Sequence, residues 1–395
     1  MNGGDLLQVE GTIGAFRLAR RRKREVASRV KILFVIKAMS SAGGGAERVL
    51  SQIASIFAAK GHKVIVLSYD SPDAADFYPL AEGIQRVRLG LGQARPAKLG
   101  ETIRRMRALR RATLESMPDV VVGFMHSTYI PLGLALLGTG MPVVASEHIG
   151  YDHYRTVPLQ ALLLRATCSL FDVITATAEP VKMGFPSAVR ARMVAISNPV
   201  IAPKGAAESA SRNSRKCLLS VGRLEPQKDH RTLVEAFAAI AGDFPEWDLR
   251  IVGEGHLRGE LETQVVALGV AGRVALPGAC AQIDAEYRAA DLYVNSSLYE
   301  SFGLSTAEAL AHGVAAVGFA DCPGTNDLIR HGANGVLAQG NPRAPALALA
   351  LAQLMGSDER RASCAAAASA SVGRYSLDRI ALQWEDLLTR VTQRR

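Results

Sequence analysis

Two glutamates stand eight positions apart in the stretch ESFGLSTAEALAHG, residues 300 to 313. Carboxylates accept hydrogen bonds on both oxygens, so Glu300 and Glu308 could hold the hydroxyl groups of a sugar. Gly303 lies between them, where the chain turns from an apolar segment into an alanine-rich helix. Free N–H groups at the start of a helix attract phosphate oxygens. The stretch therefore predicts a site for a ligand that carries hydroxyls and phosphate.

The same stretch also has a purely structural interpretation. Ser305 and Glu308 fit S-x-x-E, the capping box that opens a helix, and Glu300 would then be simply exposed. We expect Ser305 to cap the helix whether or not a ligand binds there. Both interpretations of Glu308 stay open at this point.

Two cations lie in the segment VGRLEPQKD, which follows an apolar, strand-like run. Arg223 offers a planar fork and Lys228 a point charge, so a phosphate or diphosphate is the anion that suits them. Two ordinary surface cations are the alternative. The chain has no D-x-D sequence, so we expect no metal-diphosphate site of that kind. Side-chain cations would then neutralise a leaving diphosphate.

Further polar positions follow apolar runs. His126 ends VVVGFM, and Glu147 and His148 follow PVVAS. A lone histidine is usually structural, but two at the strand ends of one sheet would face a common cleft. The glycines at 43 to 45 also follow a strand and open a helix, yet they fit neither G-x-G-x-x-G, because position 48 is Arg, nor the P-loop.

Alternating strand and helix patterns must position these residues. Predicted strands lie at 31–39, 63–69, 119–124, 142–146 and 172–176 and, after a restart, at 217–221, 248–252, 274–276, 292–295 and 315–319. Residues 201–214 are small and polar, which is typical of a linker. Strand-helix alternation predicts parallel sheets covered on both faces. The expected fold class is α/β, with two doubly wound Rossmann-like domains that face a central cleft.

Length and composition agree with this organisation. A chain of 395 residues exceeds what one core usually serves, and 48% hydrophobic with 21% charged residues is ordinary for a soluble protein. Five cysteines without a C-x-x-C pair argue against disulfides and zinc and suit a cytoplasmic location. The uncharged stretch 120–146 contains a histidine, hydroxyl side chains, a proline and glycines, so we expect a strand, a polar loop and a helix there rather than a membrane span.

The formal charge of +9 is concentrated in two clusters. Residues 20–24 (RRRKR) belong to a predicted basic tail at 1–28. The second cluster reads as a basic amphipathic helix and consists of Arg104, Arg105, Arg107, Arg110 and Arg111. Such a helix either lies on an anionic membrane or is solvated. No zinc-finger or RNA-recognition signature is present, so we expect no nucleic-acid partner.

Five motifs together resemble those of the retaining glycosyltransferases of the GT-B fold, family 4. They match in order and spacing over roughly residues 31 to 390. The motifs are GGAER at 44–48, VGRLEPQKD, IVGEG at 251–255, E-x7-E at 300–308 and GFADCPGTNDLI at 318–329. The family often has Pro where this chain has Ser305.

The resemblance implies roles for matching positions. Arg223 and Lys228 would bind the donor diphosphate and stabilise it as it leaves, and Glu308 would hold the ribose. Glu300 would hold the donor sugar, and His126 would contact that sugar at its 6-position. Other expected donor contacts are Gly44, Gly45, Ser301, Phe302, Gly303 and Leu304, and candidate sugar or acceptor contacts are Glu147 and His148.

The resemblance also implies a different role for each domain. Residues 29–200 would form an acceptor-side domain and 215–375 a nucleotide-sugar-binding domain, and a helix at 376–395, around Trp384, would cross back to the first. The reaction would move a hexose or N-acetylhexosamine from a nucleotide-diphosphate sugar, UDP-linked, to a glycan or lipid-linked acceptor with retention. It would serve cell-surface polysaccharide or lipid-linked glycan synthesis, without metal ion or cofactor. A peripheral position on the inner face of the plasma membrane, against anionic lipid, would suit such an acceptor.

Three other functions stay open from the sequence. A nucleotide-sugar 2-epimerase could use the same fold. A nicotinamide oxidoreductase would use the strand, the glycines and then Asp70 after the second strand, although the third glycine is missing. A non-catalytic membrane adaptor would need the basic helix but not Arg223, Lys228 or the glutamates.

Overall fold

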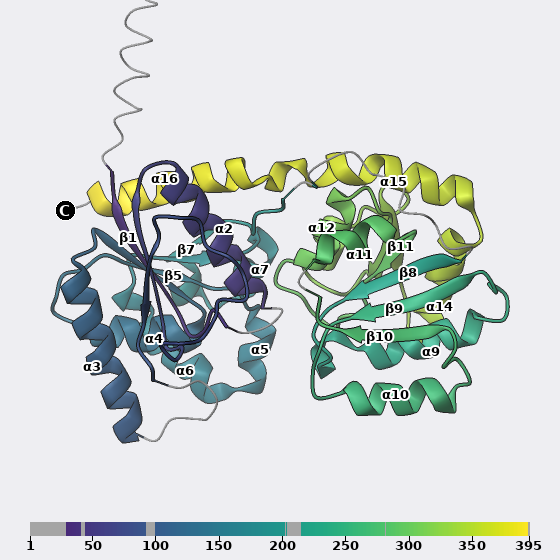
Figure 1. The fold of residues 1–395 in the computed structure, drawn as a ribbon, viewed down its shortest axis with the longest axis horizontal. Helices are drawn as coiled ribbons and strands as arrows, with labels where there is room; N and C mark the ends of the chain where they lie inside the picture. Colours follow the sequence, from purple (N-terminus) through teal and green to yellow (C-terminus); the bar gives the residue numbers. More distant parts are fainter. Residues whose placement is uncertain are drawn as a thin grey trace, which may run out of the picture.

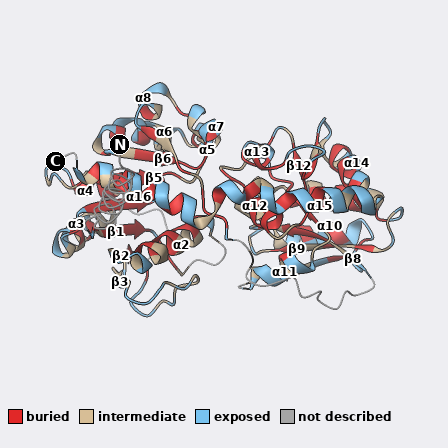
Figure 2. Cartoon of the chain, turned by 90° about the horizontal axis from the view of Figure 1, so that it is seen from above, coloured by how far each residue is buried: buried red, intermediate tan, exposed pale blue. Residues whose placement is uncertain are grey.

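The computed structural model describes residues 29–40, 44–91, 99–201, 203, 215–280 and 282–393. The predicted basic tail, position 43 and most of the predicted linker lie outside these residues. The described chain forms two α/β domains side by side, with two C-terminal helices along one side of both (Figure 1). Buried residues gather on the strands and on the inner faces of the helices of each domain (Figure 2).

The first domain contains a seven-stranded parallel sheet in the order β3-β2-β1-β4-β5-β6-β7. The strands are β1 (Lys31–Ile36), β2 (Lys63–Ser68), β3 (Gln85–Arg88), β4 (Val120–Phe124), β5 (Val143–Ser146), β6 (Val173–Ala176) and β7 (Met193–Ala195). Ile32 pairs with Val64 on one side and Val120 on the other, so β1 is central.

Helices cover both faces of this sheet because β1 is apolar on both sides. Leu33 and Val35 point into a core with α3 (Leu99–Ser116), α4 (His126–Ala135) and α6 (Pro158–Thr167). Ile32, Phe34 and Ile36 point into the opposite core with α2 (Gly45–Ala59) and α16 (Leu377–Gln393). Short helices complete the domain: α5 (Tyr151–Thr156), η1 (Cys168–Leu170), α7 (Glu179–Met183) and α8 (Ser187–Arg190).

The second domain contains a six-stranded parallel sheet in the order β10-β9-β8-β11-β12-β13. The strands are β8 (Lys216–Val221), β9 (Trp247–Val252), β10 (Val274–Gly278), β11 (Leu292–Val294), β12 (Ala316–Phe319) and β13 (Gly335–Ala338). One core involves α9 (His230–Ile240), α10 (Arg258–Ala267) and α14 (Arg343–Met355). The other involves α11 (Ile283–Ala289), α12 (Leu304–Ala311) and α15 (Asp358–Val372). The remaining helices are η2 (Pro226–Lys228), α13 (Thr325–Leu328) and η3 (Gly373–Tyr375).

The strands predicted from apolar runs are all present, and the structure adds β3, β7 and β13. Each of these three lies at the edge of its sheet and is three or four residues long. Runs of three or four residues are too short to show a clear apolar period. In addition, QRVR in β3 is nowhere fully buried.

The chain crosses between the domains at two adjacent places. The Val200 N–H donates to the Tyr375 carbonyl at 2.8 Å, which joins the first crossing to the second. Helix α16 then packs against α2 and β4, and the Trp384 ring stacks on Phe124 at 6.4 Å between centroids. This packing ties the end of the chain to the first domain.

The uncharged stretch 120–146 forms β4, α4 and β5. The expected polar loop is wrong, because α4 begins directly at His126. Met125 makes the turn with a positive φ of 69°, so no loop residues are needed. Among the described residues, we find no helix with the length and apolar character that a membrane crossing requires.

Candidate active site

Two cavities lie in the cleft between the domains, at the carboxyl ends of both sheets. The first, of about 580 Å³, is lined by the segments after β8, β9 and β10, by α11 and α12, and by residues of the first domain. The second, of about 690 Å³, is lined by the start of α2, the segments after β5 and β8, and residues 299–304. Gly45, Arg223 and Leu304 line both cavities, which therefore adjoin.

Lys228 and Glu300 join the two cavities. Lys228 lines the first and Glu300 the second, and Lys228 Nζ donates to Glu300 Oε1 at 2.5 Å. Ser297 Oγ donates to the same oxygen at 2.7 Å. The Gln227 amide holds the Tyr299 carbonyl at 2.8 Å, which fastens the two loops together. The sequence placed these two charges 72 positions apart, and the fold brings them into contact.

Arg223 lies at the boundary between the cavities. Its guanidinium is half exposed and pairs with Glu225 at 2.7 Å, two residues further on. Across the cleft, Glu47 lines the second cavity. Burial raises the pKa of Glu47, while its backbone hydrogen bond and then Arg223 act in the opposite direction. The boundary thus has a half-exposed cation that an incoming anion can engage.

Helix α12 begins two residues earlier than a capping box at Ser305 requires. Gly303 is the N-cap, with φ of 80°, and makes no side-chain cap. The prediction that Ser305 caps this helix is therefore wrong, because Ser305 already lies in the first turn. Its hydroxyl accepts a hydrogen bond from the Tyr293 hydroxyl at 2.8 Å instead. Glycine is needed here because the left-handed conformation strains other residues.

Glu308 is consequently free of any capping role and points into the first cavity. Its Oε2 accepts a hydrogen bond from the Tyr287 hydroxyl at 3.0 Å. Arg48 Nη1 of the first domain lies 2.7 Å from Oε1, but the approach is not aligned as a hydrogen bond, and Oε1 is buried without such a partner in the described chain. Burial raises the pKa of Glu308 and Arg48 lowers it. A carboxylate with an unused acceptor oxygen suits ligand hydroxyls.

Ser301 connects the domains at the wall of the second cavity. Its hydroxyl donates to the His148 carbonyl at 2.6 Å, and its carbonyl accepts from Thr177 Oγ1 at 2.6 Å. His148 lines the same cavity, and its ring stacks on Phe124. Burial lowers the pKa of His148 to about 4, so the ring is neutral at neutral pH.

Glu147 does not contact a cavity. Its carboxylate is buried and accepts from the Tyr129 hydroxyl at 2.6 Å, the Tyr154 hydroxyl and the N–H groups of His148 and Ile149. All these partners lie in the first domain, and the sugar or acceptor contact of Glu147 stays a prediction. Its effect is to fix the backbone at His148, which does line the second cavity.

His126 lies behind the wall rather than in it. Its side chain is almost fully buried at the start of α4, and its ring lies 5.6 Å from that of His153. His153, on α5, lines the second cavity. The contact of His126 with a donor sugar stays a prediction. No sequence motif marks His153, which lies on the six-residue helix α5.

Asp70 is unavailable to any cofactor. It is fully buried and accepts hydrogen bonds from the Met39 N–H at 2.8 Å and the hydroxyls of Ser40 and Ser68 at 2.7 and 2.6 Å. A ribose-binding acid of a nicotinamide enzyme must instead face the ligand. This burial removes the observation on which the oxidoreductase alternative depended.

The fold and the site together define a two-domain α/β protein with two adjoining cavities in the interdomain cleft. Two family models match the chain: Glycosyltransferase Family 4 over residues 43–201 and Glycosyl transferases group 1 over residues 203–371. Together they span most of the sequence. The chain belongs to the GT-B glycosyltransferases of family 4.

Individual relatives agree with this assignment. An α-1,4-N-acetyl-D-galactosaminyltransferase of Campylobacter jejuni, whose name includes a PP-undecaprenol-linked glycan, is 26% identical over 92% of this chain and 99% of its own. An exopolysaccharide phosphotransferase of Streptomyces coelicolor is 32% identical over 60% of this chain, which spans only 25% of that protein. Anabaena Alr3699/HepE, solved with UDP and glucose, superposes with a TM-score of 0.73 at 20% identity over 91% of this chain and 99% of its own, which shows the shared fold.

Proposed function

We propose that this glycosyltransferase moves a hexose or N-acetylhexosamine from a UDP-linked donor to a glycan or lipid-linked acceptor, with retention of anomeric configuration. The observation that carries the proposal is the Lys228–Glu300 pair, which joins two adjoining cavities at a distance of 2.5 Å. The first cavity would hold the nucleotide, with Glu308 accepting from the ribose hydroxyls. The second would hold the transferred sugar and the acceptor.

The proposed mechanism is electrostatic. A donor diphosphate at the boundary would draw Lys228 and Arg223 toward its oxygens, and the N-terminus of α12 would add its N–H groups. As the sugar-phosphate bond breaks, these groups would stabilise the charge that develops on the leaving diphosphate. Glu300, released from Lys228, would accept hydrogen bonds from the donor sugar.

The acceptor hydroxyl would attack from the same face that the diphosphate leaves, and the departing phosphate oxygen would take its proton. We propose no covalent intermediate, because no carboxylate has been assigned as a nucleophile. Neither a metal ion nor a cofactor enters this scheme, since Arg223 and Lys228 supply the positive charge and the nucleotide-sugar is a substrate.

Two comparisons support the substrate classes. The name of the Campylobacter relative includes a glycan linked to PP-undecaprenol, and the Anabaena protein was solved with UDP and glucose. We propose by extension a lipid-linked acceptor in cell-surface glycan synthesis, reached from the cytoplasmic face of a membrane. On α3, Arg104, Arg107 and Arg111 are exposed, and Arg111 pairs with Glu115.

A donor panel tests the proposal directly. The full chain would be incubated with UDP-, GDP- and ADP-linked sugars, with and without a lipid-diphosphate glycan acceptor, and the products identified by mass spectrometry and by NMR of the anomeric proton. We expect a new glycoside with the donor's anomeric configuration only when acceptor is present. A free 2-epimer formed without acceptor would favour the epimerase, and an inverted product would overturn retention.

A further inference from the structure

The wall of the first cavity is not built by the second domain alone. Four residues of the first domain also line it: Gly45 and Arg48 from α2, and Phe77 and Tyr78 from the loop between β2 and β3. The sequence resemblance assigned a role only to the glycine. The other three side chains face a cavity whose remaining lining comes from the opposite domain.

Arg48 makes the charged contact across the cleft. Its guanidinium lies 2.7 Å from Glu308 Oε1, and the two side chains are 19% and 5% exposed. The groups that face Glu308 come from several elements: Arg48 from α2, Tyr78 from the loop after β2, Asp284 and Tyr287 from α11, and Tyr293 from β11. Arg48 is the cation in this set, so it offsets the cost of burying the Glu308 charge.

Phe77 and Tyr78 form an aromatic pair beside this contact. Their ring centroids lie 4.9 Å apart in an edge-to-face arrangement, and both side chains are half-buried. Burial raises the pKa of Tyr78 to about 12, so its hydroxyl stays protonated and can donate a hydrogen bond. Aromatic faces at a nucleotide pocket suit base stacking, which is worth about 1–3 kcal/mol per base in other proteins.

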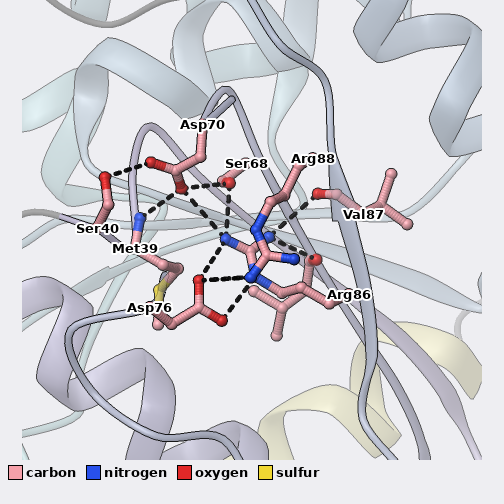
Figure 3. Close-up of polar contacts among 9 residues, drawn as sticks. Met39, Ser40, Ser68, Asp70, Asp76, Arg86, Val87 and Arg88 are labelled. Atoms are coloured by element: carbon pink, nitrogen blue, oxygen red, sulfur yellow. Dashed lines mark hydrogen bonds and ion pairs between the residues drawn. The ribbon is translucent and has the colours of Figure 1, made fainter. Parts of the chain in front are cut away.

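A buried polar network holds the aromatic loop in place (Figure 3). Asp76, the residue before Phe77, accepts from Arg86 at 3.0 Å and pairs with Arg88 at 3.3 Å. Arg86 also reaches Asp70, which is fully buried, at 3.2 Å. The network therefore joins the loop to β3 and to the end of β2.

The same network reaches the segment that follows β1. Asp70 accepts from the Met39 N–H, and the Phe77 N–H donates to the Met39 carbonyl at 2.8 Å. The aromatic pair is thus fixed relative to the segment after β1. A rigidly supported pair can contact a ligand without losing much conformational entropy.

We propose that Arg48 and Tyr78 form the first-domain half of the nucleoside site: Tyr78 packs against the nucleoside and Arg48 positions the Glu308 carboxylate for the ribose hydroxyls. The inference rests on the proposed function, because it requires a nucleotide donor in the first cavity. Nucleoside binding then connects the two domains, and the second domain by itself forms an incomplete donor site.

The roles of the two residues differ in their pH dependence. The ionised form of Glu308 accepts hydroxyl bonds, so nucleoside binding is lost as pH falls through the pKa of this carboxyl. Arg48 lowers that pKa. Replacing Arg48 by Met therefore moves the loss of binding to higher pH, whereas a change in Tyr78 weakens binding equally at every pH.

Calorimetric titration of the full chain tests the inference with three probes: UDP, uridine and inorganic pyrophosphate. The variants are Arg48→Met, Arg48→Lys, Tyr78→Ala and Tyr78→Phe, and Arg360→Met is the matched control, since Arg360 is exposed on α15 away from both cavities. Each titration is repeated from mildly acidic to mildly alkaline pH, and folding is verified by thermal unfolding.

We expect Arg48→Met and Tyr78→Ala to weaken UDP and uridine by about tenfold or more, which corresponds to ~1.4 kcal/mol. Pyrophosphate affinity should stay unchanged, Arg48→Lys should recover part of the loss, and Tyr78→Phe most of it. As the pH is lowered, only Arg48→Met should lose nucleoside affinity at a higher pH than the wild type does. Unchanged uridine affinity in folded variants, or an equal loss for pyrophosphate, would overturn the inference. Wild-type protein that binds no UDP, GDP or ADP would instead refute the proposed function.

Discussion

The two cavities of the cleft differ in how their walls are assembled. The first has a charged framework from one domain, with Lys228 and Glu308 after neighbouring strands, and receives Arg48 from across the cleft. The second is shared more evenly, and direct bonds such as Ser301 to His148 hold its two sides together. Short motifs can encode the first arrangement, whereas the second depends on packing between domains.

The largest effect on activity is expected from substitutions where the two cavities meet. Arg223→Ala and Lys228→Ala should each lower kcat by about 100- to 1,000-fold, because their charge matters most when the diphosphate leaves. Steady-state rates with saturating acceptor measure this, and acceptor KM should change little. Arg231→Ala is the control, since that cation is exposed and pairs with Glu260 at 3.7 Å. Turnover within a few-fold of wild type would remove either residue from the mechanism.

Substitution of Glu308 should weaken ligand binding in the first cavity more than in the second. Glu308→Ala should weaken donor binding by about 1.5–3 kcal/mol, because the ribose hydroxyls lose a charged acceptor. Glu308→Gln keeps the volume and removes only the charge, so it separates the two effects. Titration with UDP measures affinity, and chemical denaturation measures stability alongside, because Arg48 and Tyr287 lose their partner. Unchanged affinity in a folded variant would exclude the ribose role.

Buried histidines, one in each domain, should make both domains sensitive to acid. Burial lowers the pKa of His148 from 6.5 to about 4 and that of His230 from 6.5 to about 3. Protonation then favours the unfolded chain, so stability present above pH 6.5 is lost as pH falls toward those values. We expect each histidine to contribute on the order of 2 kcal/mol to this loss.

Urea denaturation across that pH range measures the effect. His148→Asn should flatten the pH dependence of the first domain and His230→Asn that of the second. An unchanged slope in both variants would show that other groups, such as paired carboxylates, cause the acid sensitivity.

The smallest expected effect concerns the outer surface of the first domain. Arg104 and Arg107 are exposed on α3, and each should contribute about 1 kcal/mol to binding of anionic bilayers, less at high salt. Flotation with anionic and neutral liposomes compares wild type with the double alanine variant and with Arg360→Ala. Equal binding to both liposome types, or none, would contradict membrane association and leave sugar transfer intact.

Much of the fold was predictable because central strands of parallel sheets are continuous apolar runs. Both sheets and their order of strand and helix follow from that pattern, while β3, β7 and β13 were not predicted because each is only three or four residues long. The capping-box motif predicted that Ser305 caps the helix, which is wrong. A local motif indicates a helix start, but the left-handed conformation available to Gly303 places that start two residues earlier.

The sequence by itself determined the family, the two-domain α/β fold and the residue types of the proposed donor site, because strand ends in such sheets face a common cleft. Only the tertiary structure decided which side chains meet there. It turned Glu147 inward to two tyrosines, placed His153 in front of His126 and set Arg48 against Glu308. These contacts join residues far apart in the chain, and their distances depend on packing between elements, which no local pattern of residues records.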